Sequence, residues 1–118
     1  MSRNPLIVVS TVLAWLFRAR SQTSIDPRAI RVIDGDTIEY LGKRHRLDGF
    51  DAPEIFHPAS RHELQQGIEA KQTLAGYVAA ASRAELICYE TDRYGRTLAS
   101  LRLDGHDVAG LMTTTGRK

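Results

Sequence analysis

RVIDGDTIEYLGKRHRLDGFDAPE, residues 31–54, sets the architecture of this chain. Apolar residues alternate with polar ones around Val32, and again at Ile38 and Tyr40, with the two-residue period of a half-buried strand. Asp34-Gly35 interrupts this alternation and predicts a tight turn, because glycine reaches positive φ without steric cost. We therefore expect a strand, a turn and a second strand in the first half of the stretch.

A third strand is predicted for the second half of the stretch. Residues 41–43 read LGK and favour another turn, and residues 44–50 then read as a strand. Pro53 cannot donate a hydrogen bond to a sheet, so the strand should end before it. Asp51 and Ala52 are thus expected at the strand end.

The rest of the chain predicts a helix, two more strands and a short helix. Ser60 is a candidate N-cap and Glu63 completes a capping box, so a helix should run from there to about residue 84. Its apolar stripe is expected on Leu64, Ile68, Ala75 and Val78. Residues 85–90 and 96–103 read as strands, and 107–114 as a short helix. Five strands with a helix after the third predict a mainly β fold, a Greek-key barrel of the OB type.

Residues 1–28 are expected to be a leader and residues 29–118 the folded domain. The leader carries a formal charge of +3 and contains a 12-residue, mostly apolar run at positions 6–17. This run is short for a bilayer span and suits the apolar region of an export signal. A cleaved signal, an uncleaved membrane anchor and a transit peptide remain open. The expected location is exported, secreted or periplasmic, or membrane-anchored.

The charge of the predicted domain limits how it would bind nucleic acid. Residues 29–118 contain 12 basic and 13 acidic side chains, a formal charge of −1. A binder that works by overall phosphate neutralisation needs a basic surface, which this domain lacks. Affinity for phosphate must then come from local arginines and a metal ion. The single Cys88 permits no internal disulfide.

Three blocks of sequence, taken together, resemble the thermonuclease family of staphylococcal-nuclease-like phosphodiesterases. They are VIDGDTI at 32–38, RLDGFDAPE at 46–54 and DRYGRTLA at 92–99. Each block carries residue types that the chemistry needs, and the order matches that of the family over about residues 29–116. The resemblance implies the same OB-type fold and a nuclease acting on DNA or RNA, here expected as a monomer.

The resemblance also implies a Ca²⁺ site. Asp36 and Asp51 match the two carboxylate ligands of the family, and Ala52 matches a position that contributes a backbone carbonyl. Asp34 would orient the ligands without touching the ion. A hard cation with oxygen ligands and several waters suits such an open site. On its own, an aspartate pair in a turn is more commonly explained by turn conformation than by metal binding.

Catalytic and substrate-binding roles follow from the same resemblance. Glu54 matches the general base, and Arg46 and Arg96 match arginines that grip the phosphate and neutralise charge in the transition state. A guanidinium suits this role because its fork meets two phosphate oxygens. Tyr94 matches a tyrosine that contacts phosphate, and Arg93 stands where the family often has a basic residue. Without the resemblance, these arginines would be read as surface residues of strands.

Two departures from the family bear on the interpretation. Asp48 occupies a position that is usually apolar, and an unpaired carboxylate would be costly if it faced the barrel interior. Family members also continue with a C-terminal helix that we expect to be missing here. The alternative function is therefore a non-catalytic OB-fold module that binds nucleic acid. The joint presence of Asp36, Arg46, Asp51, Glu54 and Arg96 favours the nuclease, because a binding module gains nothing from carboxylates that repel phosphate.

Overall fold

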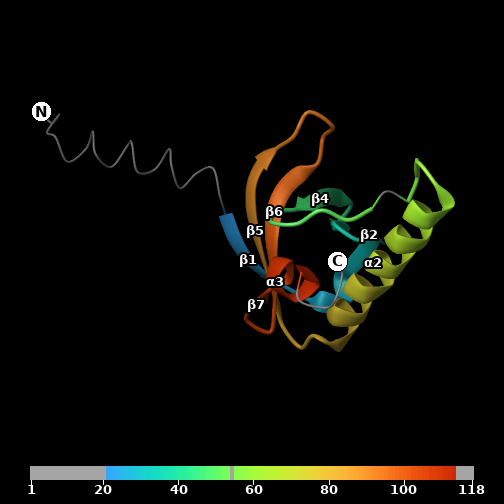
Figure 1. Cartoon of the computed structure of the whole chain (residues 1–118). Coiled ribbons are helices and arrows are strands. Elements are labelled where there is room, and N and C mark those ends of the chain that lie inside the picture. Colours follow the sequence, from blue (N-terminus) through green and yellow to red (C-terminus); the bar gives the residue numbers. More distant parts are fainter. Residues whose placement is uncertain (1–20, 54, 114–118) are drawn as a thin grey trace, which may run out of the picture.

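In the described part of the chain, a single mixed sheet and two α-helices form the fold (Figure 1). The computed structural model describes residues 21–53 and 55–113. The strands follow the order β1-β5-β6-β4-β3-β2, with β7 paired to β6, and of these pairs only β4 with β6 is parallel. The elements are β1 (Ser21–Ile25), the 3-10 helix η1 (Pro27–Ala29), β2 (Ile30–Asp34), β3 (Thr37–Tyr40), β4 (Lys43–Leu47), α2 (Arg61–Ala80), β5 (Ala84–Thr91), β6 (Thr97–Leu103), β7 (His106–Asp107) and α3 (Val108–Thr113).

The predicted fold class is confirmed, with two strands added. All five predicted strands and both predicted helices are present, and the mainly β arrangement is that of an OB-like fold. The sheet is not closed into a barrel, since β1 and β2 form the two ends of the strand order. The additional strands are β7 and β1, of which β1 pairs along its whole length with β5. It lies within the range that we assigned to the leader, so the described fold already begins at Ser21.

The apolar run at residues 6–17, on which the export and membrane predictions depend, lies outside the described residues. Among the residues that are described, no helix is both long and apolar enough to cross a membrane.

Helix α2 begins as predicted but packs on a different face. The Ser60 hydroxyl accepts a hydrogen bond from the Glu63 N–H at 3.0 Å, and the Glu63 carboxylate accepts one from the N–H of Ala59. The capping box is therefore present, although the glutamate reaches one residue further back than in the usual box. The predicted stripe is only partly confirmed: Val78 is buried, Leu64 and Ala75 are half-buried and Ile68 is exposed. The buried positions are Gly67, Ala70, Leu74 and Val78.

Small residues explain the altered face of α2. The β2–β3 turn packs so closely on the helix that a Cβ added at Gly35 would lie 2.6 Å from the Cβ of Ala70 and 2.6 Å from that of Ala52. Gly35 is not among the residues with positive φ, so the conformational reason that we gave for this glycine was wrong. A glycine is required here because the turn, which also carries Asp36, packs closely against both α2 and the loop after β4.

His45 is a buried histidine on the core side of β4. Its side chain is 4 % exposed, and its Nδ1 has no hydrogen-bond partner in the described part of the chain. Burial lowers the pKa of His45 below its usual value, because the interior disfavours the charged imidazolium. Arg46, the next residue, projects from the opposite face of the strand, where the arginine can meet solvent.

Acid is therefore expected to destabilise the fold through His45. Above pH 6.5 the imidazole is neutral in both states and contributes no pH dependence. Below pH 6.5, His45 binds a proton in the unfolded chain but stays neutral in the folded chain. The free energy of unfolding therefore falls by up to about 1.4 kcal/mol per pH unit until the pKa of His45 in the folded chain is reached. Urea unfolding at pH 7.5, 6.5 and 5.5 measures this slope. His45→Leu should flatten it and His62→Gln, at an exposed position of α2, should not; equal slopes in all three proteins would contradict the assignment.

Candidate active site

Two distant parts of the sequence meet in one open hollow of about 400 Å³. Arg46 and Asp51 line it from β4 and the loop that follows, and Asp92 and Arg96 line it from the β5–β6 turn. The parallel pairing of β4 with β6 causes this meeting, because it sets Arg46 beside Leu98. Three residues assigned from sequence, Arg46, Asp51 and Arg96, are thus brought together.

The loop after β4 differs from the prediction in its length. The strand ends at Leu47, not at residue 50, and the chain turns at Gly49 with φ of 99°. Asp48 is exposed, so its carboxylate does not enter the core and carries no burial cost. Its N–H donates to the carbonyl of Ala99 at 2.8 Å, which fixes the beginning of the loop against β6.

Arg46 is held by four acceptors around its guanidinium. Its Nη1 donates to the carbonyl of Leu47 and to that of Phe50 at 3.1 Å. Its Nη2 lies 3.4 Å from Oδ2 of Asp36 and is ion-paired with Asp51. The Arg46 side chain is 20 % exposed, whereas that of Asp51 is 90 % exposed. The guanidinium therefore has a fixed position at the edge of the hollow, between the buried carboxylate of Asp36 and the exposed carboxylate of Asp51.

Asp36 is a buried carboxylate with too little positive charge around it. Burial, and after it the hydrogen bond with the Asp34 side chain, raises the pKa of Asp36. The N–H of Ala52, 3.0 Å from Oδ2, and the charge of Arg46 act against this rise without cancelling it. Asp34 also accepts the backbone N–H of Asp36 at 3.2 Å, as expected of a residue that orients the carboxylate. A cation near Asp36 would relieve the cost of its ionised form.

The oxygens present fit a hard divalent cation. Asp36 and Asp51 both contact Arg46, and Ala52 is tied to Asp36, so the proposed ligands adjoin one another. Carboxylate and carbonyl oxygens are the donors that Ca²⁺ prefers, with waters completing the shell. Within residues 21–53 and 55–113, no group of three or more His, Cys, Asp or Glu side chains is placed to hold an ion. The oxygens of Asp36, Asp51 and Ala52 would therefore form a weak, open cation site.

The β5–β6 turn holds Arg96 and the two residues assigned to substrate binding. Tyr94 is 73 % exposed, and the guanidinium carbons of Arg93 and Arg96 lie 5.7 and 5.6 Å from its ring centroid. Neither Tyr94 nor Arg93 lines the hollow itself. Asp92 does line it and is ion-paired with Arg96 at 3.0 Å, a contact that our sequence reasoning missed. The sequence contained one indication of this ion pair, because the two opposite charges are four residues apart.

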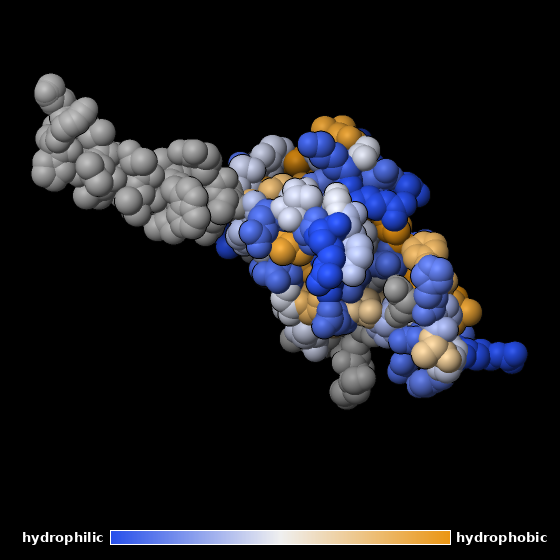
Figure 2. Space-filling model, turned by 90° about the horizontal axis from the view of Figure 1, so that it is seen from above, coloured by the Kyte–Doolittle hydropathy of each residue, from blue (hydrophilic) through white to orange (hydrophobic). Residues whose placement is uncertain are grey.

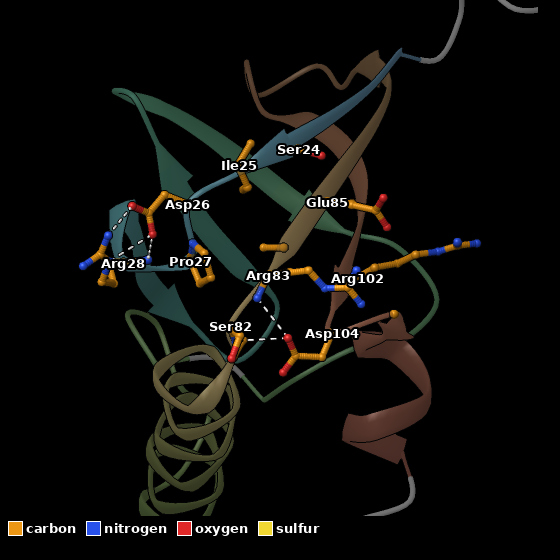
Figure 3. Close-up of a pocket in the computed structure, with 13 residues that line it drawn as sticks. Ser24, Ile25, Asp26, Pro27, Arg28, Ser82, Arg83, Glu85, Arg102 and Asp104 are labelled. Atoms are coloured by element: carbon orange, nitrogen blue, oxygen red, sulfur yellow. Dashed lines mark hydrogen bonds and ion pairs between the residues drawn. The ribbon is translucent and has the colours of Figure 1, made fainter.

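Further hollows lie elsewhere on the described surface. One, of about 520 Å³, adjoins the first through Phe50 and Asp51 and extends between the beginning of α2 and the end of α3. Another, of about 510 Å³, lies beside the end of β1 and contains none of the residues assigned to the site (Figure 3). Its arginines are balanced by as many acids, and Asp104 accepts the N–H groups of Ser82 and Arg83.

The surface has no large apolar area on the face seen in Figure 2. Hydrophilic side chains cover most of that face, and hydrophobic residues are confined to small separate patches. Of the described residues, the large hydrophobic ones that are exposed are Leu41, Phe56, Ile68 and Tyr94. Glu54, the predicted general base, lies outside the described residues.

Comparison with known proteins places this chain in a family. The family model described as staphylococcal nuclease homologue matches residues 44–117, a range that includes Arg46, Asp51 and Arg96. The chain is also 31 % identical, over 114 residues, to the succinoglycan biosynthesis protein ExoI of Rhizobium meliloti (strain 1021). That similarity covers 92 % of this chain and 60 % of the relative, so the chain spans well under the relative's full length. The predicted resemblance is confirmed: the chain belongs to the staphylococcal nuclease homologue family.

Proposed function

We propose that this chain is a Ca²⁺-dependent nuclease that hydrolyses phosphodiester bonds of DNA or RNA. The observation that supports this most is the placement of Arg46 and Arg96 on two sides of one hollow, with Asp51 beside them. Two guanidinium groups so placed can contact different oxygens of one phosphate. Family membership supports the same reaction class.

Arg46 and Arg96 would stabilise the charge that builds up on the phosphoryl oxygens. Two carbonyls and two carboxylates fix the position of Arg46, so a phosphate would contact it by taking the place of one of these acceptors, of which Asp51 is the most exposed. Within the described part of the chain, the terminal nitrogens of Arg96 donate no hydrogen bond, which leaves them available to an anion. Arg96 is therefore better suited than Arg46 to contact the phosphate group on which charge builds up during the reaction.

Asp36, Asp51 and the carbonyl of Ala52 would hold the cation. When bound, it supplies positive charge that offsets both the carboxylates and the phosphate. The carboxylates otherwise repel an incoming phosphate, and only Arg46 balances them among the described residues. Asp34 would keep Asp36 in place through its bond to the backbone N–H of that residue.

Glu54 would act as the general base. In hydrolysis, the oxygen of water forms a bond to phosphorus while the bond from phosphorus to the leaving oxygen breaks, and a base takes the proton of the water. Glu54 follows Pro53 in the loop that carries Asp51 and Ala52, so its place in the chain is compatible with this role. The adjoining hollow that shares Asp51 offers room for a neighbouring nucleotide of an extended substrate.

Cleavage by the chain is expected to require added Ca²⁺. The test is to incubate the full chain with single- and double-stranded DNA and with RNA, in Ca²⁺ or in excess chelator. Two carboxylates and a carbonyl bind calcium weakly, so chelator should abolish the products and calcium should restore them. Full activity in excess chelator would contradict the metal assignment. Binding of nucleic acid without cleavage under any divalent metal would favour the non-catalytic binding module, and the test would also decide between DNA and RNA.

The leader and the assembly state complete the proposal. We propose that residues 1–20 direct export or membrane attachment and that the enzyme works as a monomer.

A further inference from the structure

We propose that Asp92 is a positioning residue, whose carboxylate orients Arg96 toward the phosphate while it also builds the β5–β6 turn. The inference rests on the proposed function for its consequence in catalysis. The contact itself is a property of the fold and can be tested without activity. Asp92 and Arg96 both line the hollow that contains Arg46 and Asp51.

The two oxygens of the Asp92 carboxylate have different partners. Oδ1 accepts the backbone N–H groups of Tyr94 and Arg96, each at 2.9 Å. Oδ2 accepts Nε of Arg96 at 3.0 Å. The backbone closes the same turn, with the Asp92 N–H donating to the carbonyl of Arg96 at 2.7 Å and the Gly95 N–H donating to that of Asp92 at 3.1 Å. One oxygen thus shapes the turn and the other holds the arginine.

Contact through Nε sets the direction of the guanidinium. The group is planar, so a contact at Nε fixes the orientation of its plane and leaves the terminal nitrogen on its far edge pointing away from the carboxylate. The ring of Tyr94 lies 5.6 Å from the Arg96 guanidinium carbon and restricts the group from another side. The Arg96 side chain is 32 % exposed and that of Asp92 is 19 % exposed, so water only partly competes with the pair. An arginine held in this way loses less freedom when it binds phosphate.

The surroundings also keep Asp92 ionised. Burial acts to raise the pKa of Asp92, but the backbone N–H groups of Arg96 and Tyr94, with the Arg96 charge, hold it below its usual value. At neutral pH both oxygens therefore remain acceptors.

Asp92→Asn separates the two functions of the carboxylate. Asparagine keeps one oxygen for the turn but places an amide NH₂ where Oδ2 accepted Nε. The expected result is a kcat lower by about 10- to 100-fold, the effect of a small misplacement of a catalytic group, with less change in KM. Added to Arg96→Ala, the substitution should cost nothing more, because the residue it positions is already absent.

Asp104→Asn is the matched control. Asp104 also uses Oδ1 to accept two backbone N–H groups, those of Ser82 and Arg83 in the α2–β5 connection, at 3.0 and 2.9 Å, but it lines the hollow of Figure 3. Its φ of 52° suits asparagine well. This variant should therefore retain wild-type kcat and stability.

A second measurement is independent of catalysis. In the full chain, the Nε–H proton of Arg96 should give a separate NMR signal that is slow to exchange with water, and Asp92→Asn should abolish it. If wild-type protein shows this signal but cleaves nothing, the proposed nuclease function fails while the positioning contact stands. An unchanged signal together with an unchanged kcat in Asp92→Asn would overturn the inference.

Asp92→Ser guards against misfolding of the asparagine variant. A serine hydroxyl can accept the turn N–H groups in a weaker form of the same turn, and it has no second oxygen for Arg96. We expect the same loss of the NMR signal and of kcat. If neither variant gives a folded circular dichroism spectrum, Asp92 serves the fold alone and the positioning role is overturned.

Discussion

Arg46→Ala and Arg96→Ala are each expected to lower kcat by about 10²- to 10³-fold, the usual cost of removing a positioned electrostatic donor. Both side chains line the same hollow, and each would meet charge that develops on the phosphate. Lysine at either position should restore only part of the rate, because an ammonium group cannot make the two-pronged contact.

The two arginine variants should differ in stability. Removal of Arg46 leaves the carboxylates of Asp36 and Asp51 without their shared counter-charge. In the absence of metal, Arg46→Ala should therefore also move the midpoint of unfolding to a lower urea concentration. Added Ca²⁺ should lessen that shift. Arg96→Ala removes a partner only from Asp92, whose Oδ1 still accepts two backbone N–H groups, and it gives the cleaner kinetic result.

Single-turnover cleavage in saturating Ca²⁺ is the measurement for these variants. Arg102→Ala is the control. Arg102 lies on β6, the strand that begins directly after Arg96, but it lines the hollow of Figure 3 and has no ion pair among the described residues. It should cleave at the wild-type rate. A loss of tenfold or less in both Arg46→Ala and Arg96→Ala would make them ordinary surface residues.

Glu54→Gln is expected to reduce turnover by about 10²-fold or more and to leave substrate binding intact. The amide keeps the shape of the side chain but cannot take a proton from water, and a general base contributes roughly 10²–10⁴ in rate. Binding should hold or tighten slightly, because one negative charge near the phosphate is removed. The separation of turnover from affinity is what identifies a base.

Paired measurements distinguish this result from a trivial loss of structure. Cleavage with Ca²⁺ and equilibrium binding of a short oligonucleotide are measured on the same folded samples, checked by circular dichroism. Glu90→Gln, an exposed glutamate of β5, should change neither quantity. Equal cleavage by wild type and Glu54→Gln would remove Glu54 from the mechanism. Binding without any cleavage in wild type would support the binding module.

Local sequence was sufficient for most of the secondary structure and for the family. The alternation around Ile38, the capping residues Ser60 and Glu63 and the turn glycines act on their near neighbours, so their effects can be read along the chain. The three blocks that resemble the nuclease family also lie in short stretches of sequence. The predicted site residues Arg46, Asp51 and Arg96 came from those blocks.

Long-range packing decided the features that the sequence did not predict. Ser21–Ile25 has four exposed residues and no apolar alternation, and it is a strand because β5 offers it a partner edge. The buried face of α2 follows from the close approach of Gly35 to Ala70, which periodicity within the helix cannot reveal.

The site itself is the clearest product of tertiary structure. Residue types predicted which side chains could bind phosphate, but the parallel pairing of β4 with β6 brings Arg46 and Arg96 to one hollow. The Asp92 turn then sets the direction of Arg96 through a single carboxylate oxygen. Distances between side chains that are far apart in sequence depend on how the whole sheet is assembled, and this is why only the folded structure decides them.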